Sequence, residues 1–425
     1  MKLLENKKIK GTVLYTLGIH IICFLVVISS ASIWVQSDVA IIPPNILKYC
    51  IWGLTGGISI FTAKKLDMSF GLNILLIVTL AIAYMCSNYT YINGGLSLVF
   101  IPIFLFYFLA YENSKISSFT ICEAMINVLC LMAIVSIVFY VAGSILKILR
   151  PTGYYSYEWS WIGRVPSYFN LYFEPMPAGL QNMVITRNCG IYPEAPMYCF
   201  PLCVALGLQE LIVYGDKKKS YILALTILTT GSTTGILFLI GLYGYKYISK
   251  KGWKNKVING ILILISLVVI SCLIYVVMIR KTTTGSYSVR VDHIQACIMT
   301  MLRTKFLGSG IGNQSMLEQY MSYKQGASVG FLYLLAVGGI FPALMLLIPV
   351  LYTMIKAFER KNVDMICFAS LFLLLVFLTQ IVFRNILWFI VARVFMVSDS
   401  LTPRSEDKCF RKKYIIKLVH NKKYN

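Results

Sequence analysis

Charged residues are scarce in this chain of 425 residues: they make up 13% of it, and only 17 residues are acidic. Soluble globular domains carry about 25% charged residues, so this chain has too little polar surface to cover a water-soluble body. Hydrophobic residues make up 58% and recur in long runs from end to end. The composition therefore excludes a cytosolic enzyme, a DNA-binding module and a secreted disulfide scaffold, and it predicts a polytopic membrane protein.

Metal-binding patterns are also missing. The chain has 3 histidines, and its 12 cysteines include no Cys-x-x-Cys pair. Most of the cysteines lie inside apolar segments, where they behave as small hydrophobic residues. We therefore expect no metal and no other cofactor.

Basic residues, in contrast, are in excess, and the formal net charge is +22. In a soluble protein this charge would suggest nucleic acid as a partner. In a membrane protein it reflects the excess of Lys and Arg on cytoplasmic loops, so we expect no nucleic acid. The N-terminal segment MKLLENKKIKG precedes a long apolar run without a small-residue cleavage site. This pattern predicts a retained signal anchor.

The apolar runs predict an all-α protein with about 12 transmembrane helices. Two regions, 220–248 and 364–398, lie between basic clusters that both belong in the cytoplasm, so each region crosses the membrane an even number of times and is interpreted as two short helices. Both termini are then cytoplasmic in a protein of the cell membrane, and 26 of the 39 Lys and Arg residues lie on cytoplasmic segments. The expected helices are 12–35, 45–63, 70–86, 95–111, 119–147, 195–214, 220–231, 234–248, 257–279, 329–355, 364–383 and 386–398.

Two long segments, about 148–194 and about 280–328, are expected outside the membrane. Connections are usually about 4–6 residues long, and much longer ones usually carry function. The first segment is rich in aromatic residues, which suit either an aromatic belt at the membrane interface or a platform for sugars. The sequence thus predicts four parts. The N-terminal helices occupy 1–147, and a core with both external segments occupies 148–345. The C-terminal helices occupy 346–398, and a basic cytoplasmic tail occupies 399–425.

Three polar clusters are candidates for chemistry. The first is Arg187-Asn-Cys-Gly-Ile-Tyr-Pro-Glu194-Ala-Pro, just before the helix expected at 195–214. Arg187 offers a planar fork for phosphate oxygens, and Glu194 either accepts a proton or pairs with Arg187. The second cluster is the hydroxyl-rich turn around Ser232, which either caps the helix that follows or binds an anion at the start of that helix.

The third cluster lies in the second external segment, which keeps basic charge on the side where basic residues are usually depleted. Residues 290–304 have the apolar spacing of an amphipathic surface helix. The glycines after it either let backbone N–H groups approach a ligand or form a plain loop. The candidate residues here are Arg290, Asp292, Arg303, Lys305, Gly308, Gly310 and Gly312.

The order of these motifs resembles the O-antigen polymerase/ligase family. The resemblance rests on Arg-x-x-Gly-x-x-x-Glu-x-Pro, then Thr-Gly-Ser-Thr-Thr-Gly, then Ser-x-Arg and Phe-Leu-Gly-x-Gly-x-Gly-Asn, and covers roughly 180–345. It implies a membrane glycosyltransferase whose donor is a glycan on undecaprenyl pyrophosphate. Arg187 and Arg290 would then stabilise the leaving pyrophosphate, supported by Arg303 and Lys305, while Glu194 or Asp292 would serve as the base.

Within that family the sequence favours a polysaccharide polymerase for an O-antigen, capsule or exopolysaccharide. The ligase branch has a histidine before the helix that follows the second external segment, whereas residues 326–333 contain none. A flippase or other transporter of the lipid-linked oligosaccharide is the third alternative, and it should carry ionisable residues at mid-membrane. Few candidates exist: Glu123, Glu210 and Arg384. The implied partners are the lipid-linked oligosaccharide, the lipid bilayer, a chain-length regulator and a flippase.

Overall fold

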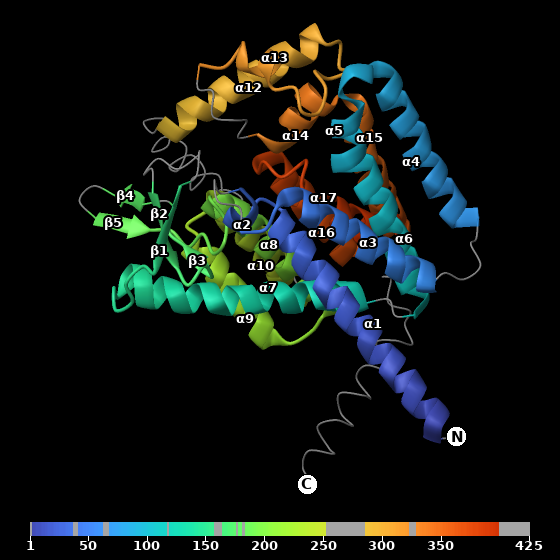
Figure 1. Cartoon of the computed structure of the whole chain (residues 1–425), viewed down its shortest axis with the longest axis horizontal. Coiled ribbons are helices and arrows are strands. Elements are labelled where there is room, and N and C mark those ends of the chain that lie inside the picture. Colours follow the sequence, from blue (N-terminus) through green and yellow to red (C-terminus); the bar gives the residue numbers. More distant parts are fainter. Residues whose placement is uncertain are drawn as a thin grey trace.

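The computed structural model describes residues 2–36, 41–62, 68–116, 119–156, 164–175, 177–180, 183–251, 285–322 and 329–398. The helix expected at 257–279 and the basic tail at 399–425 lie outside this part of the chain. The described part is mostly helical (Figure 1). Its longer helices are α1 (Lys2–Ser29), α3 (Pro44–Thr62), α4 (Met68–Ser87), α6 (Ile101–Ile116), α7 (Thr120–Phe139), α8 (Ala195–Gly207), α9 (Lys217–Thr229), α10 (Thr233–Lys251), α12 (Gly285–Arg303), α15 (Ile340–Glu359) and α16 (Val363–Leu378).

Five helical stretches in the described residues are long and apolar enough to cross a membrane. They are Phe70–Ser87, Tyr89–Ser114, Thr120–Ile145, Ala195–Val213 and Ile340–Glu359. Membrane association is therefore supported, while the count of twelve crossings goes beyond what these lengths establish. The stretch at 89–116 includes a short helix, α5 (Ile92–Gly95), before α6.

Both predicted helix pairs are present. Helices α9 and α10 are separated by a tight turn in which Gly231 has a φ of +56°, and Asp216 caps α9 by accepting the N–H of Lys218 at 2.9 Å. After α16 the chain turns and continues as α17 (Asn385–Ile390), whose helix extends to 396. The two pairs were predicted from charge alone, because each segment has basic residues on both flanks.

The first external segment corrects the expectation of an all-α fold. It contains a three-stranded antiparallel sheet in the order β1-β2-β3 and a two-stranded sheet of β4 and β5. Most of its described aromatic residues, including Tyr168, Tyr172 and Phe173, are buried and pack the sheet onto the end of α7. The strands are β1 (Gly153–Ser156), β2 (Arg164–Tyr168), β3 (Tyr172–Phe173), β4 (Pro177–Leu180) and β5 (Met183–Thr186).

The span expected at 329–355 is also corrected, because the chain breaks at Gly339. A short helix, α14 (Gly330–Tyr333), continues to 338, and α15 begins at Ile340. Gly339 has a φ of +77°, and a Cβ there would lie 2.1 Å from the carbonyl oxygen of Leu307. The second external segment therefore packs against this break at backbone distance.

Helices α8 and α17 form the centre of the molecule. Almost every residue of α8 is buried, and every residue from Ile386 to the end of α17 is buried as well. The start of α17 is attached to the end of α1: Asn385 donates to Ser29 Oγ at 2.9 Å, and the N–H of Ile386 donates to Ser30 Oγ at 3.1 Å. Figure 1 shows the strands and α12 on one side of the molecule and the start of α1 on the opposite side.

Candidate functional site

Arg187 lies where the chain leaves β5 and approaches α8, and its guanidinium is attached to the turn between α9 and α10. Its Nε donates to the carbonyl oxygen of Thr230 at 2.8 Å, and its Nη2 donates to that of Gly231 at 3.3 Å. The neighbouring Asn188 strengthens the contact, since its backbone N–H and side chain donate to Thr229 O and Oγ1 at 3.1 and 3.0 Å. The first two predicted clusters therefore form one structural unit.

Glu194 stands immediately before α8, and the local sequence explains its position. Gly190 has a φ of +58°, and a Cβ there would approach the ring of Tyr198 to 2.9 Å, so the turn requires glycine. Pro196 occupies the first turn of α8, where proline loses no hydrogen bond. The backbone carbonyl of Glu194 accepts the N–H of Met197 at 3.1 Å, while its side chain makes no capping bond to the helix. The carboxylate is thus left for other interactions.

Arg290, on the first turns of α12, completes a cluster with Arg187 and Glu194. Burial raises the pKa of the Glu194 carboxyl, and the positive charges of Arg187 and then Arg290 lower it. Burial lowers the pKa of Arg290, the charge of Glu194 raises it, and that of Arg187 lowers it again. Two long segments far apart in the sequence, 148–194 and 280–328, therefore bring two guanidinium groups near one half-buried carboxylate.

The three charged groups are close enough to interact electrostatically, but they are not in contact. Within the described residues no hydrogen bond or ion pair joins either guanidinium to the Glu194 carboxylate. A structural Arg–Glu pair would show such a contact, with N and O about 2.7–2.9 Å apart. Arg187 and Arg290 therefore act on the Glu194 carboxylate through their charge and without a direct bond.

Ser232 lies within the turn between α9 and α10. Its side chain is buried, its backbone N–H donates to Thr230 Oγ1 at 3.2 Å, and its carbonyl oxygen accepts the N–H of Ile236 at 3.0 Å. Of the two interpretations of the hydroxyl-rich turn, the local structural one fits these bonds. The turn contributes to the site through its carbonyl groups, which hold Arg187.

Asp292 is directed away from the cluster. Its two carboxylate oxygens accept the backbone N–H of Ser322 at 3.1 and 2.9 Å. Residues two apart on a helix differ by about 200° in direction, so Arg290 and Asp292 lie on opposite sides of α12. Asp292 therefore fixes the chain after α12, and Glu194 is the carboxylate that accompanies the arginines.

Arg303 and Lys305 are separate from the cluster as well. The guanidinium of Arg303 donates to Gln319 Oε1 and to Tyr320 Oη, both at 3.1 Å. At 1.5 Å per residue, Arg303 lies about 20 Å along the helix from Arg290. Lys305 is exposed just beyond the end of α12, with a φ of +51°. The structure thus brings together Arg187, Glu194 and Arg290, and leaves these two basic residues elsewhere.

The glycines after α12 serve close packing. A Cβ on Gly308 would lie 2.4 Å from the backbone nitrogen of Gly339, and one on Gly310 would lie 2.4 Å from the ring of Tyr91. The N–H groups of the loop bind protein carbonyls, with Ser309 donating to Ala336 at 3.0 Å and Gly310 to Val337 at 2.9 Å. Gly312, at a φ of +104°, has open space around it. The loop docks on the helix break at Gly339, so it is a support for α12.

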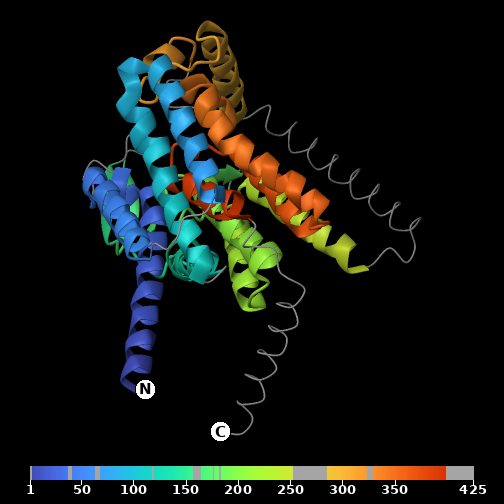
Figure 2. The same ribbon diagram turned by 90° about the vertical axis from the view of Figure 1, so that its right-hand side faces the viewer.

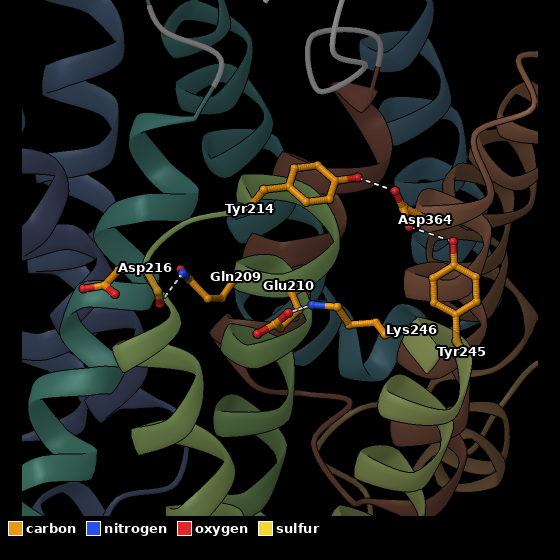
Figure 3. Close-up of polar contacts among 7 residues, drawn as sticks. All are labelled: Gln209, Glu210, Tyr214, Asp216, Tyr245, Lys246 and Asp364. Carbon is orange, nitrogen blue, oxygen red and sulfur yellow. Dashed lines mark hydrogen bonds and ion pairs between the residues drawn. The ribbon is translucent and has the colours of Figure 1, made fainter. Parts of the chain in front are cut away.

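The opposite end of α8 carries a second polar group (Figure 3), of which the sequence singled out Glu210 but not its partners. Glu210 forms an ion pair with Lys246 of α10. Asp364, at the start of α16, accepts the hydroxyls of Tyr245, at 2.7 Å, and of Tyr214. These contacts join three helices. They also place Glu210, one of the few ionisable residues that a transport pathway could use, in an ion pair with Lys246.

No group of three or more His, Cys, Asp or Glu side chains gathers as a metal site within the described ranges. Comparison with known proteins gave no match: no family model fits the chain, no curated protein is similar to it, and no solved structure resembles it.

Proposed function

We propose that the protein is a membrane glycosyltransferase that polymerises polysaccharide repeat units carried on undecaprenyl pyrophosphate. The observation that carries the proposal is the cluster of Arg187, Glu194 and Arg290, in which the charges of two guanidinium groups act on one carboxylate. Paired guanidinium groups suit the oxygens of a diphosphate. The order of motifs along the chain, which resembles that of the O-antigen polymerase/ligase family, supports the same chemistry.

The reaction follows from the roles that these side chains allow. A hydroxyl oxygen of the acceptor repeat unit forms a bond to the anomeric carbon of the donor glycan, and the bond from that carbon to the pyrophosphate oxygen breaks. The leaving diphosphate takes the bonding electrons, and Arg187 and Arg290 stabilise its developing charge. Glu194 accepts the hydroxyl proton, a role that its raised pKa suits. No nucleotide sugar is needed.

Replacing Arg187 with alanine tests this function. We expect single repeat units to accumulate on the lipid carrier at the outer face, because leaving-group stabilisation worth about 2.7–4 kcal/mol is lost. Lipid-linked glycans should be extracted and sized, with an externally added glycosidase to report on which side they lie. The control is Arg164→Gln, since Arg164 is an exposed residue of β2 and should leave polymer unchanged.

Other outcomes of that experiment identify the alternative functions. Long chains that remain on the lipid would indicate a ligase, because a ligase acts after polymerisation. Single units protected from the glycosidase would indicate a flippase, because they would be stranded inside. Normal polymer at normal protein level would remove Arg187 from the site.

The pH dependence of the rate should change when a guanidinium is removed. Protonated Glu194 cannot accept a proton, so activity falls as pH drops through the pKa of this carboxyl. Arg290 lowers that pKa; in Arg290→Gln burial acts with less opposition, and the acid limb should move to higher pH. The residual rate of the purified protein, measured across pH with lipid-linked repeat units, checks this. An acid limb that stays in place would show that Glu194 is not the titrating group.

The complete topology is part of the proposal: twelve helices, both termini in the cytoplasm of a cell-membrane protein, and the strands and α12 outside. A cysteine in place of exposed Lys218 should be shielded from an impermeant thiol reagent in intact cells, and one in place of exposed Ser315 should react. The unsubstituted chain supplies the background from its own cysteines. Equal labelling at the two positions would contradict the even number of crossings in 220–248.

A further inference from the structure

Helix α12 has two opposite faces. The face that packs on the protein consists of small or polar residues that are at most 2% exposed: His293, Ala296, Cys297 and Thr300. The opposite face carries Ile298, Met299 and Leu302, which are 42%, 52% and 60% exposed. These three large apolar side chains therefore point away from the rest of the molecule, which is the reverse of what a water-exposed helix shows.

The exposed apolar residues continue beyond α12. Phe306 and Leu307 follow directly and are also exposed. The carbonyl oxygen of Phe306 accepts the N–H of Ile340 at 2.9 Å, which joins this segment to the first residue of α15. Figure 2 shows α12 at the end of the molecule where α15 begins.

Helix α15 is one of the five stretches able to cross a membrane, and it has its own exposed stripe. The exposed residues recur at helical spacing from its first residue to its end: Ile340, Ile348, Leu351, Tyr352, Ile355 and Phe358. In a spanning helix such a stripe contacts lipid, because water is absent there. The exposed apolar residues of 298–307 therefore adjoin a lipid-facing surface at its upper end.

Basic residues accompany the apolar ones. Arg303 and Lys305 are both exposed between Leu302 and Phe306. Helices that lie in the membrane interface combine buried large apolar side chains with Lys and Arg near the phosphate headgroups. A water-exposed helix would gain nothing from this pattern, and a patch of this kind on a soluble surface would promote association.

We propose that the exposed face of α12, which consists of Ile298, Met299 and Leu302 together with Phe306 and Leu307, docks on the surface of a phospholipid bilayer. Arg303 and Lys305 then lie among the phosphate headgroups. The proposal is independent of the catalytic function. It means that the bilayer holds the helix whose first turns carry Arg290.

Quenching of tryptophan fluorescence by brominated lipids tests the contact. The full-length chain is reconstituted in phosphatidylcholine–phosphatidylglycerol vesicles with and without bromine on the acyl chains. Leu302→Trp places a reporter on the exposed face of α12, and Ser315→Trp places one at an exposed position of α13 (Ser315–Glu318). The 6 native tryptophans give a background that the unsubstituted chain measures.

Brominated lipids should remove most of the emission added by Leu302→Trp and little of that added by Ser315→Trp. Iodide dissolved in the water should quench the emission added by Ser315→Trp more than the emission added by Leu302→Trp. Emission from Leu302→Trp that iodide quenches and bromine does not would overturn the proposal, because the face would then meet water. Emission that neither quencher reaches would also overturn it, since another protein or a second copy would cover the face.

Discussion

Replacing Arg290 with lysine is expected to lower the rate of polymer formation by about 10²- to 10³-fold, the loss typical of removing one preorganised donor to a developing anion. Lysine keeps the positive charge, but it is a flexible point charge without the planar fork that binds two phosphate oxygens. Arg290 is half-buried beside Glu194 and Arg187, so the loss of the guanidinium should lower the rate more here than at a fully exposed position. Polymer length in cells and the rate with purified lipid-linked units both report the loss.

The matched control for this substitution is Arg164→Lys, on the exposed side of β2 in the other external segment. It makes the same chemical change outside the cluster, and polymer should remain normal. Normal polymer from Arg290→Lys, at a protein level equal to that of the control, would show that charge alone suffices at this position. The bidentate role of Arg290 would then be wrong, even if Arg290→Ala were inactive.

Gly94→Ala should produce the largest loss of stability among the substitutions considered. Gly94 lies in α5, and a Cβ there would be 1.8 Å from the carbonyl oxygen of Ile311. A backbone atom cannot turn away as a side chain does, so either α5 or the loop after α12 must move. We expect a cost of about 3 kcal/mol, at the upper end for overpacking. The midpoint of thermal unfolding in detergent measures it.

Gly57→Ala is the matched control, because Gly57 is also helical and has nothing within 4 Å of an added Cβ. Alanine favours a helix over glycine, so this variant should be as stable as the original chain or slightly more stable. Equal midpoints for the two variants would show that α5 and the loop at 311 are not in close contact. The loop after α12 would then not be held by α5, and its role as a support for α12 would be wrong.

Much of the helical architecture was readable from hydrophobicity and charge. The break between α9 and α10 followed from lysines on both flanks of a segment with small hydroxyl residues at its centre. The sheets did not, because β1 to β5 have two to five residues each and their partners are set by contacts that no local pattern encodes. The break at Gly339 could not be predicted from the sequence either, because it depends on the backbone of Leu307 lying against Gly339.

The candidate site was predicted in part. The positions of Arg187, Glu194 and Arg290 along the chain marked them as external charged residues, and the structure brings these three together. The same reasoning gave equal weight to Asp292, although helical geometry alone separates it from Arg290 by about 200°. That Arg187 is held by the carbonyls of Thr230 and Gly231 was beyond the sequence, because it depends on where a turn of another helix pair lies.

If the α9–α10 pair enters the membrane as proposed, the attachment of Arg187 to the turn between these helices makes lipid composition a determinant of the proposed site. Helix α9 has 13 residues and is therefore about 20 Å long, whereas the hydrocarbon core of a bilayer is about 30 Å thick. Helix α10 is longer, with 19 residues, so the shorter α9 limits the hairpin. In the proposed topology the depth of the hairpin tip then depends on local membrane thickness, and mismatch is met by thinning or tilting. Longer acyl chains would thus lower the guanidinium relative to the headgroup phosphates, and shorter chains would raise it.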